Sequence, residues 1–256
     1  MQCGSDAIKT TRGASIRELA DAQALGRTCA AIIAERLRAL LARRQLVHLA
    51  LCGGRSPVLA YELLGASDLP WERVQLWFVD ERCVGPDDPD SNALLVRKTL
   101  LAGAHGCNAR LRRIEGERGP QEAAKSYEAL LHAHLEQRQD GLPQLDLALL
   151  GIGEDGHIAS LFPDHAALEQ QSGRLCLPVL DSPKPPPERV TLSLAMLRGA
   201  RGCLLLASGA AKARALARAL GAPSGQAPVS MLDHDRLCVL ADRPAAAELA
   251  EAVRRA

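Results

Sequence analysis

Short apolar runs of strand length recur along the chain and alternate with segments of helical periodicity. The clearest runs are "LVHLALC" at 46–52, "VQLWFV" at 74–79 and "LDLALLG" at 145–151. Nearly every position in them is apolar, which is typical of strands that a parallel sheet buries on both faces. Helices are predicted at 18–44, 57–64, 91–103 and 120–139. This alternation predicts an α/β fold, with a doubly wound, mostly parallel sheet and helices on both faces (Rossmann-like).

The same alternation continues to the end of the chain. It includes a weak strand at 110–114, apolar segments at 189–197, 202–208 and 236–241, and helices at 210–220 and from 244. The proline-rich segment "LDSPKPPPER" (180–189) could link two domains, because prolines favour a stiff, extended path. Strands and helices resume on both sides of it, so we interpret it as a loop across one face. We therefore expect residues 1–256 to form a single domain.

Composition excludes several classes of protein. The 31 basic and 30 acidic residues give a net charge of +1, so no basic face for nucleic acid or a membrane surface is indicated. The eight cysteines form no CxxC pair and lie mostly in apolar runs, which favours buried free thiols over disulfides or zinc. No signal peptide or membrane span is evident. We expect a soluble, cytoplasmic protein with no nucleic-acid or membrane partner, either a monomer or a weak dimer.

A glycine pattern in "GIGEDGHIASLFP" (151–163) matches the spacing of a dinucleotide-binding turn. Asp155 would then lie inside the phosphate cradle, where its charge would repel a pyrophosphate. The acidic residue expected about 20 positions later is also replaced by a proline-rich stretch. The pattern is therefore a weak indication of a nicotinamide or flavin enzyme.

Three polar loops begin where predicted strands end, namely "GGRSP" (53–57), "DER" (80–82) and "GIGEDGH" (151–157). Ligands of parallel sheets bind beyond the carboxyl ends of the strands, so we expect the three loops to share one cleft. Their convergence is stronger evidence for a site than any single motif.

The first two loops carry groups suited to an anion. Backbone N–H groups at Gly53, Gly54 and Arg55 could face a phosphate, with Ser56 as a helix cap, although an ordinary capped turn explains them equally well. Arg82 could clamp a phosphate, and Asp80 could orient a base or hold a sugar hydroxyl. A solvated charge cluster ahead of a helix capped at Ser91 is the plainer interpretation of this second loop.

The third loop offers a general base. His157 lies two residues after Asp155, and a carboxylate beside a histidine fixes its tautomer. A core histidine bonded to backbone is the alternative. No further ligands stand at metal spacing, so we expect neither a metal nor a cofactor. Lys184, Arg189 and Lys212 are further cations that could reach an anion.

These segments resemble the signature segments of the 6-phosphogluconolactonases. "GGRSP", "WFVDERCVGPDDPDSN", "LLGIGEDGHIASLFP" and "PKPPPERVTL" occur in the same order as in that family, over roughly residues 46–215. The resemblance implies hydrolysis of 6-phospho-D-glucono-1,5-lactone, a step of the oxidative pentose phosphate pathway. It implies His157 as the base, Asp155 as its partner, Asp80 beside them, and the two loop glycines, Arg55, Ser56, Arg82, Lys184 and Arg189 around the phosphate.

Two alternatives on the same scaffold stay open. The related glucosamine-6-phosphate deaminases share a "DGH" loop and the Asp at position 80, but continue with a glutamate-bearing "FNEP" segment. This chain has Ser160–Pro163 there, and Arg82 stands where a deaminase carries an aromatic residue. A sugar-phosphate-sensing regulator would need a helical DNA-binding domain, for which little chain precedes the strand at 46–52.

Overall fold

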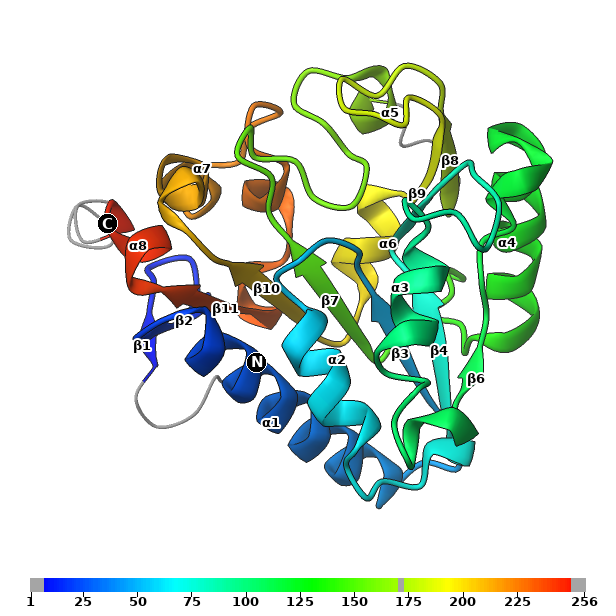
Figure 1. Ribbon diagram of the computed structural model, residues 1–256. Helices are drawn as coiled ribbons and strands as arrows, with labels where there is room; N and C mark the ends of the chain where they lie inside the picture. Colours follow the sequence, from blue (N-terminus) through cyan, green and yellow to red (C-terminus); the bar gives the residue numbers. More distant parts are fainter. Residues whose placement is uncertain (1–6, 170–172, 250–256) are drawn as a thin grey trace.

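We describe a computed structural model of the protein, in which residues 7–169 and 173–249 are placed (Figure 1). Its central feature is an eight-stranded sheet with the order β1-β2-β11-β10-β7-β3-β4-β6. All neighbouring strands in it are parallel except β1 and β2. Its strands are β1 (Ile8–Lys9), β2 (Ser15–Leu19), β3 (Val47–Leu51), β4 (Val74–Phe78), β6 (Arg110–Leu111), β7 (Leu147–Gly151), β10 (Cys203–Ala207) and β11 (Leu237–Asp242).

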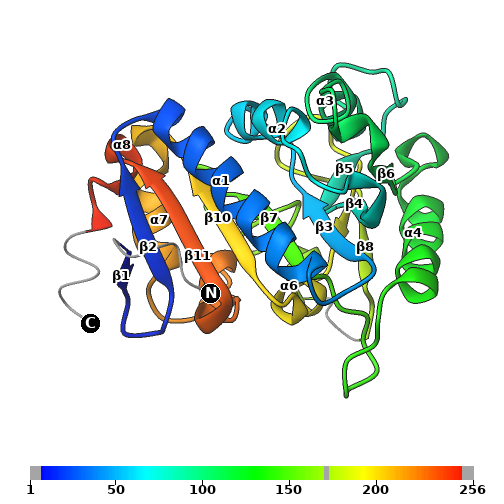
Figure 2. The same cartoon turned by 90° about the horizontal axis from the view of Figure 1, so that it is seen from below.

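Helices cover both faces of this sheet (Figures 1 and 2). On one face α1 and α2 pack against each other, with α3 beside them, and α6 and α7 lie on the other face. The helices are α1 (Ala22–Leu41), α2 (Val58–Gly65), α3 (Asn92–Lys98), α4 (Pro120–His134), α5 (Ala166–Glu169), α6 (Leu194–Gly199), α7 (Ala213–Ala219) and α8 (Arg243–Ala246). The expected doubly wound, mostly parallel α/β fold is confirmed.

A second, three-stranded antiparallel sheet was not predicted. It consists of β5 (Asp80–Arg82), β9 (Arg189–Leu192) and β8 (Cys176–Val179), and α4 packs against it. Val79 joins it to the main sheet, because its N–H donates to Leu51 at the end of β3 and its carbonyl accepts from Leu192. The "DER" tripeptide is therefore a strand, and the segment 189–197 is divided between β9 and α6.

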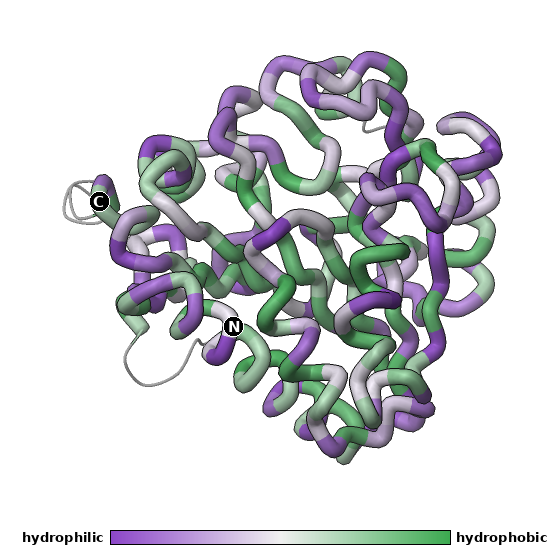
Figure 3. The backbone as a smooth tube through the Cα atoms, in the orientation of Figure 1, coloured by the Kyte–Doolittle hydropathy of each residue, from purple (hydrophilic) through white to green (hydrophobic). Residues whose placement is uncertain are grey.

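The core is aliphatic, as the strand sequences indicate. Strands β3, β4 and β10 are buried at every position, and the strands are the most apolar parts of the tube in Figure 3. All six aromatic residues are nevertheless in the core, each less than 2% exposed. No helix in the described part of the chain has the length and apolar character needed to cross a bilayer.

Two local predictions were wrong. Pro57, not Ser56, is the N-cap of α2, and no side chain makes a capping hydrogen bond there. The turn before the helix is closed by the Val58 N–H, which donates to the Arg55 carbonyl. Cys238 is disulfide-bonded, whereas free thiols were expected throughout. The six other described cysteines are free, and four of these are buried.

Candidate functional site

A cavity of about 740 Å³ opens at the carboxyl ends of β3, β5, β7 and β10. Strands β3 and β7 are neighbours, and the chain leaves them in opposite directions, to β4 and to β10. Such a point of reversal is where open α/β sheets bind ligands. Eight of the ten predicted site residues line this cavity, namely Gly53, Gly54, Arg55, Ser56, Asp80, Arg82, His157 and Arg189.

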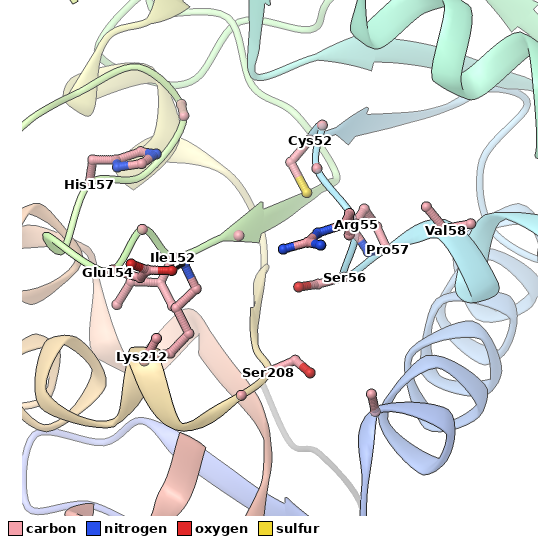
Figure 4. Close-up of a pocket in the computed structure, with 18 of the residues that line it drawn as sticks. Cys52, Arg55, Ser56, Pro57, Val58, Ile152, Glu154, His157, Ser208 and Lys212 are labelled. Atoms are coloured by element: carbon pink, nitrogen blue, oxygen red, sulfur yellow. Dashed lines mark ion pairs between the residues drawn. The ribbon is translucent and has the colours of Figure 1, made fainter. Parts of the chain in front are cut away.

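The loop after β3 places two polar side chains at the cavity. Gly54 has a φ of +92°, a conformation that glycine adopts at little cost, and this turn redirects the chain into α2. Arg55 and Ser56 then extend from the loop toward the cavity, opposite His157 (Figure 4). A side chain at Gly53 would collide with the Asn92 amide, so the backbone can approach Asn92 only because this residue is glycine.

Asp80 is held by a buried network beside this loop. Its Oδ2 accepts a hydrogen bond from the Ser160 hydroxyl at 2.6 Å, and the Asn92 amide donates to its carbonyl oxygen at 2.9 Å. Asp80 is 5% exposed and Ser160 is fully buried. The carboxylate therefore reaches the cavity in a fixed orientation, which suits a group that positions a substrate hydroxyl or a water molecule.

Glu81 organises the helix that supplies Asn92. Its carboxylate accepts the backbone N–H groups of Asn92 and Ala93, each at 2.8 Å, and the hydroxyl of Ser91. Burial raises the pKa of Glu81, although these backbone N–H bonds oppose the shift. The Ser91 hydroxyl accepts the N–H of Leu94, so the predicted cap at Ser91 is confirmed.

Two arginines on the antiparallel sheet face the cavity. Arg82 donates from Nη1 to the Asp90 carbonyl at 2.5 Å, and its buried Nε has no partner. Arg189 is 4% exposed and donates to the carbonyls of Lys184, Pro185 and Pro186, each at 3.0 Å. Burial lowers the pKa of Arg189, with the charge of Asp80 opposing. Both guanidinium groups thus bond to carbonyls, and no ion pair joins either of them to a carboxylate of the described residues, although Asp80 lies close enough to affect Arg189.

The loop after β7 builds an aspartate–histidine pair. His157 Nδ1 lies 2.6 Å from Asp155 Oδ1, and the His157 ring packs on Phe162 with centroids 4.6 Å apart. A side chain at Gly153 would strike both His157 and Asp155, and Gly156 turns the chain with a φ of +99°. The glycine spacing thus makes room for this pair. It leaves Nε2 as the imidazole nitrogen that can face the cavity.

Two lysines pair with the carboxylates of the same loop. Lys184 Nζ lies 3.2 Å from Asp155 Oδ2, and Lys212 Nζ lies 3.7 Å from Glu154 Oε1. Burial opposes ionisation of Asp155, but the bonds and charges of His157 and Lys184 outweigh it and hold the Asp155 pKa below its usual range. Burial lowers the pKa of Lys212. Lys212 and His157 line the cavity, whereas Lys184 and Asp155 are not among its lining residues.

The loop after β10 lines one side of the cavity, and the sequence analysis had identified only Lys212 in it. Ser208 lines the cavity and donates to Asp242 at 2.6 Å, and Gly209 N–H donates to the same carboxylate. The signal was present, because "SGAAK" follows an apolar strand as the other three loops do. Asn92 and Ser160 were also missed, and these two residues act through contacts that no local pattern reveals.

The arrangement can perform acid–base chemistry on an anionic substrate. The aspartate–histidine pair supplies a proton acceptor, and four cationic side chains, Arg55, Arg82, Arg189 and Lys212, line the cavity. Cys52 also lines it, but burial raises the pKa of this thiol to about 12, so it stays protonated near neutral pH and is a poor nucleophile. Among the placed residues, no group of three or more His, Cys, Asp or Glu side chains is arranged as metal ligands.

Comparison with known proteins gives a consistent result. The chain is 38% identical to a 6-phosphogluconolactonase of Pseudomonas putida, over 91% of this chain and 95% of that protein. It is 36% identical to the human 6-phosphogluconolactonase, over 80% and 81%. The 6-phosphogluconolactonase of Trypanosoma brucei superposes with a TM-score of 0.82 at 26% identity, over 95% and 99% of the two chains.

A monomeric glucosamine-6-phosphate deaminase also shares the fold, with a TM-score of 0.74 at 23% identity over 91% of this chain. A family model covers residues 20–240, which include every loop of the cavity. The chain therefore belongs to the family of glucosamine-6-phosphate isomerases/6-phosphogluconolactonase.

Proposed function

We propose that this protein hydrolyses 6-phospho-D-glucono-1,5-lactone to 6-phospho-D-gluconate, a step of the oxidative pentose phosphate pathway. The observation that supports this most directly is the Asp155–His157 pair at the edge of a cavity whose opposite side is cationic. The proposal agrees with the names of the relatives, which are 6-phosphogluconolactonases. In this proposal the chain works in the cytoplasm as one domain, as a monomer or weak dimer.

In the proposed reaction His157 is the general base. Its Nε2 takes a proton from a water molecule while the water oxygen bonds to C1 of the lactone. The resulting tetrahedral intermediate collapses when the bond from C1 to the ring oxygen breaks, and the imidazolium returns its proton to that oxygen. Asp155 fixes the tautomer with the proton on Nδ1 and stabilises the imidazolium.

The remaining residues hold the substrate in this proposal. Arg82 and the 53–56 loop bind the phosphate, with Arg189 and Lys212 adding positive charge around it. Binding of the phosphate places C1 near the water molecule, and such positioning contributes much of the rate of reactions of this kind. Asp80, fixed by Ser160, accepts a hydrogen bond from a sugar hydroxyl.

The test is lactone hydrolysis by the purified protein. The lactone is generated in the assay from glucose 6-phosphate, and formation of 6-phosphogluconate is compared with spontaneous hydrolysis. Acceleration proportional to protein concentration supports the proposal, and a rate equal to the background would refute it. Ammonia release from glucosamine 6-phosphate, measured in parallel, would instead favour the deaminase reaction. Here the bond from Ser160 to Asp80 leaves that carboxylate less free to act as a base.

A further inference from the structure

The proline-rich segment between β8 and β9 carries a cation to the rear of the Asp155–His157 pair. Lys184 Nζ lies 3.2 Å from Asp155 Oδ2, while the other oxygen of the same carboxylate is 2.6 Å from His157 Nδ1. One carboxylate is thus shared by a lysine and a histidine. Lys184 does not line the cavity, although its sequence position made it a candidate phosphate ligand.

Partly buried hydrogen bonds fix the backbone of Lys184 in this segment. The Ser182 hydroxyl donates to the Lys184 carbonyl at 2.8 Å and accepts its N–H at 3.2 Å. Arg189 Nη2 donates to the same carbonyl at 3.0 Å, and its guanidinium lies over the Phe162 ring on which His157 packs. The backbone of Lys184 is therefore held in place by three hydrogen bonds, and its side chain extends to Asp155.

We propose that Lys184 is a positioning residue that keeps His157 in its neutral, proton-accepting form by sharing the Asp155 carboxylate. This role rests on the proposed function, in which His157 is the base. A lysine charge on Asp155 reduces the negative potential at the imidazole and so disfavours its protonation. A second effect is mechanical, because a carboxylate held at both oxygens keeps Oδ1 directed at Nδ1.

The other charges near the pair do not duplicate this effect. Glu154, on the same loop, faces Lys212 rather than His157. Lys212, from the start of α7, is close enough to influence Asp155 but pairs with Glu154 at 3.7 Å. Arg189 lies 5.7 Å from the Phe162 ring centroid and donates to backbone carbonyls rather than to Asp155. Among these cations, Lys184 makes the direct ion pair with Asp155.

The experiment compares the pH dependence of kcat in the wild type, Lys184→Met, Lys184→Arg and the control Lys125→Met. Lys125 is exposed on α4, away from the cavity. Removing a partly exposed charge close to the pair should move the acid limb of the profile upward by about half to one pH unit. For Lys184→Met, kcat should fall roughly threefold to tenfold near pH 6 and little near pH 8. Lys184→Arg should restore the profile, and Lys125→Met should not move it.

A phosphate-binding role predicts a different result. The kcat/KM of Lys184→Met would then fall at every pH for the phosphorylated lactone and stay unchanged for unphosphorylated gluconolactone. The acid limb of the kcat profile would not move. That result would overturn the proposal. An unmoved acid limb combined with equal losses for both substrates would also overturn it, because Lys184 would then serve only the stability of the loop.

A second measurement separates this proposal from the proposed function. The imidazole of His157 is titrated by NMR without substrate, and its signals are assigned by their loss in His157→Ala. The midpoint should rise in Lys184→Met and not in Lys125→Met, whatever substrate the protein turns over. A protein that fails to hydrolyse the lactone but shows this rise refutes the proposed function alone. An unchanged midpoint refutes the role of Lys184.

Discussion

The two ends of the parallel sheet each carry a hollow lined by arginines, and the hollows differ in how those charges are used. At the amino ends of β7, β10 and β11, a hollow of about 1020 Å³ contains Arg138, Arg201 and Arg236. Each of these three pairs with an aspartate, namely Asp140, Asp146 and Asp233 respectively, whereas Arg12 in the same hollow donates to the carbonyls of Gly221 and Ser230. At the carboxyl ends, Arg82 and Arg189 donate to backbone carbonyls instead.

Ion pairs with aspartates are therefore the commoner arrangement at the amino end. A carboxylate neutralises an arginine, whereas a carbonyl orients the guanidinium and leaves its charge available to an anion. The histidines follow the same division. His157 is paired with the Asp155 carboxylate and lines the cavity, whereas His234 at the amino end is buried and its neighbour is the backbone of Val229 rather than a carboxylate. Each of the following comparisons pairs a change at one end with a matched change at the other.

The largest expected effect is the loss of the base. His157→Ala should lower kcat for lactone hydrolysis by roughly 10²–10⁴-fold, the usual contribution of a general base, with little change in KM. His234→Ala should lower the Tm, because it leaves a void at a residue that is 3% exposed, and should leave kcat unchanged. Steady-state kinetics and thermal melts of the two variants check these expectations. A near-normal kcat in a folded His157→Ala protein would remove His157 from the mechanism.

A smaller effect is expected from the arginines. One charge-assisted contact contributes about 1.5–3 kcal/mol, so Arg82→Ala should reduce kcat/KM for the phosphorylated lactone by about 10–150-fold. Unphosphorylated gluconolactone should be hydrolysed equally by Arg82→Ala and the wild type. Arg236→Ala, at the amino end, should alter neither rate. Parallel losses for both substrates would make Arg82 a structural residue and weaken the contrast between the two ends.

Alanine substitutions at one glycine from each end test how rigid the surrounding side chains are. An added Cβ would strike Asn92 at Gly53 and Arg138 at Gly199. Asn92 is buried in the Asp80 network, so Gly53→Ala should destabilise the protein by about 1–3 kcal/mol, as overpacking does, and lower kcat/KM. Arg138 can swing away, so Gly199→Ala should cost less and leave activity intact. Denaturant unfolding gives the stabilities, and equal losses would show that the two ends are equally rigid.

The smallest expected effect is on stability at acid pH. The Asp155 pKa lies below its usual value of about 3.9, so its carboxylate stabilises the fold above that pH, and this contribution is lost as pH falls through the lowered pKa. Asp155→Asn should therefore destabilise the protein at pH 6, by no more than about 1 kcal/mol for a partly exposed pair, and the difference should shrink as pH falls below the usual value and vanish only below the lowered pKa.

Asp140, at the amino end, is the matched control for this pH effect. Its bond with Arg138 also lowers the Asp140 pKa, but the group is fully exposed. Salt should therefore reduce the effect of Asp140→Asn more than that of Asp155→Asn. The free energies of unfolding of both variants, measured at several pH values and two salt concentrations, check this prediction. Equal salt sensitivity would show that the Asp155–His157–Lys184 group is as solvated as the surface pair.

Much of the fold could be predicted because its information is local. The strands β3, β4 and β7 are runs of apolar residues that only a doubly covered sheet can bury, and each lies where the sequence predicted it. The convergence of the loops at Gly53, Asp80 and His157 followed from the same pattern, because parallel strands end at one edge. The Asp155–His157 pair was predictable from its spacing within one turn.

The antiparallel sheet could not be read from the sequence in the same way. The polar strand "DER" has no apolar run of its own, and it becomes a strand because β9, more than 100 residues later, pairs with it. The same long-range contacts attach Ser160 to Asp80 and Asn92 to the Gly53 loop. Such pairings depend on which segments the completed fold brings together.

The sequence by itself determined the parallel sheet, the edge at which a ligand binds and the aspartate–histidine pair, because strand burial and turn geometry act over a few neighbouring residues. Only the tertiary structure decided what each cation contacts. Arg189, predicted as a phosphate ligand, lines the cavity and also donates to carbonyls of the proline-rich segment, while Lys184 pairs with Asp155 and is not among the lining residues. A charged side chain is defined by its nearest partners in space, and those partners lie on strands and loops far away along the chain.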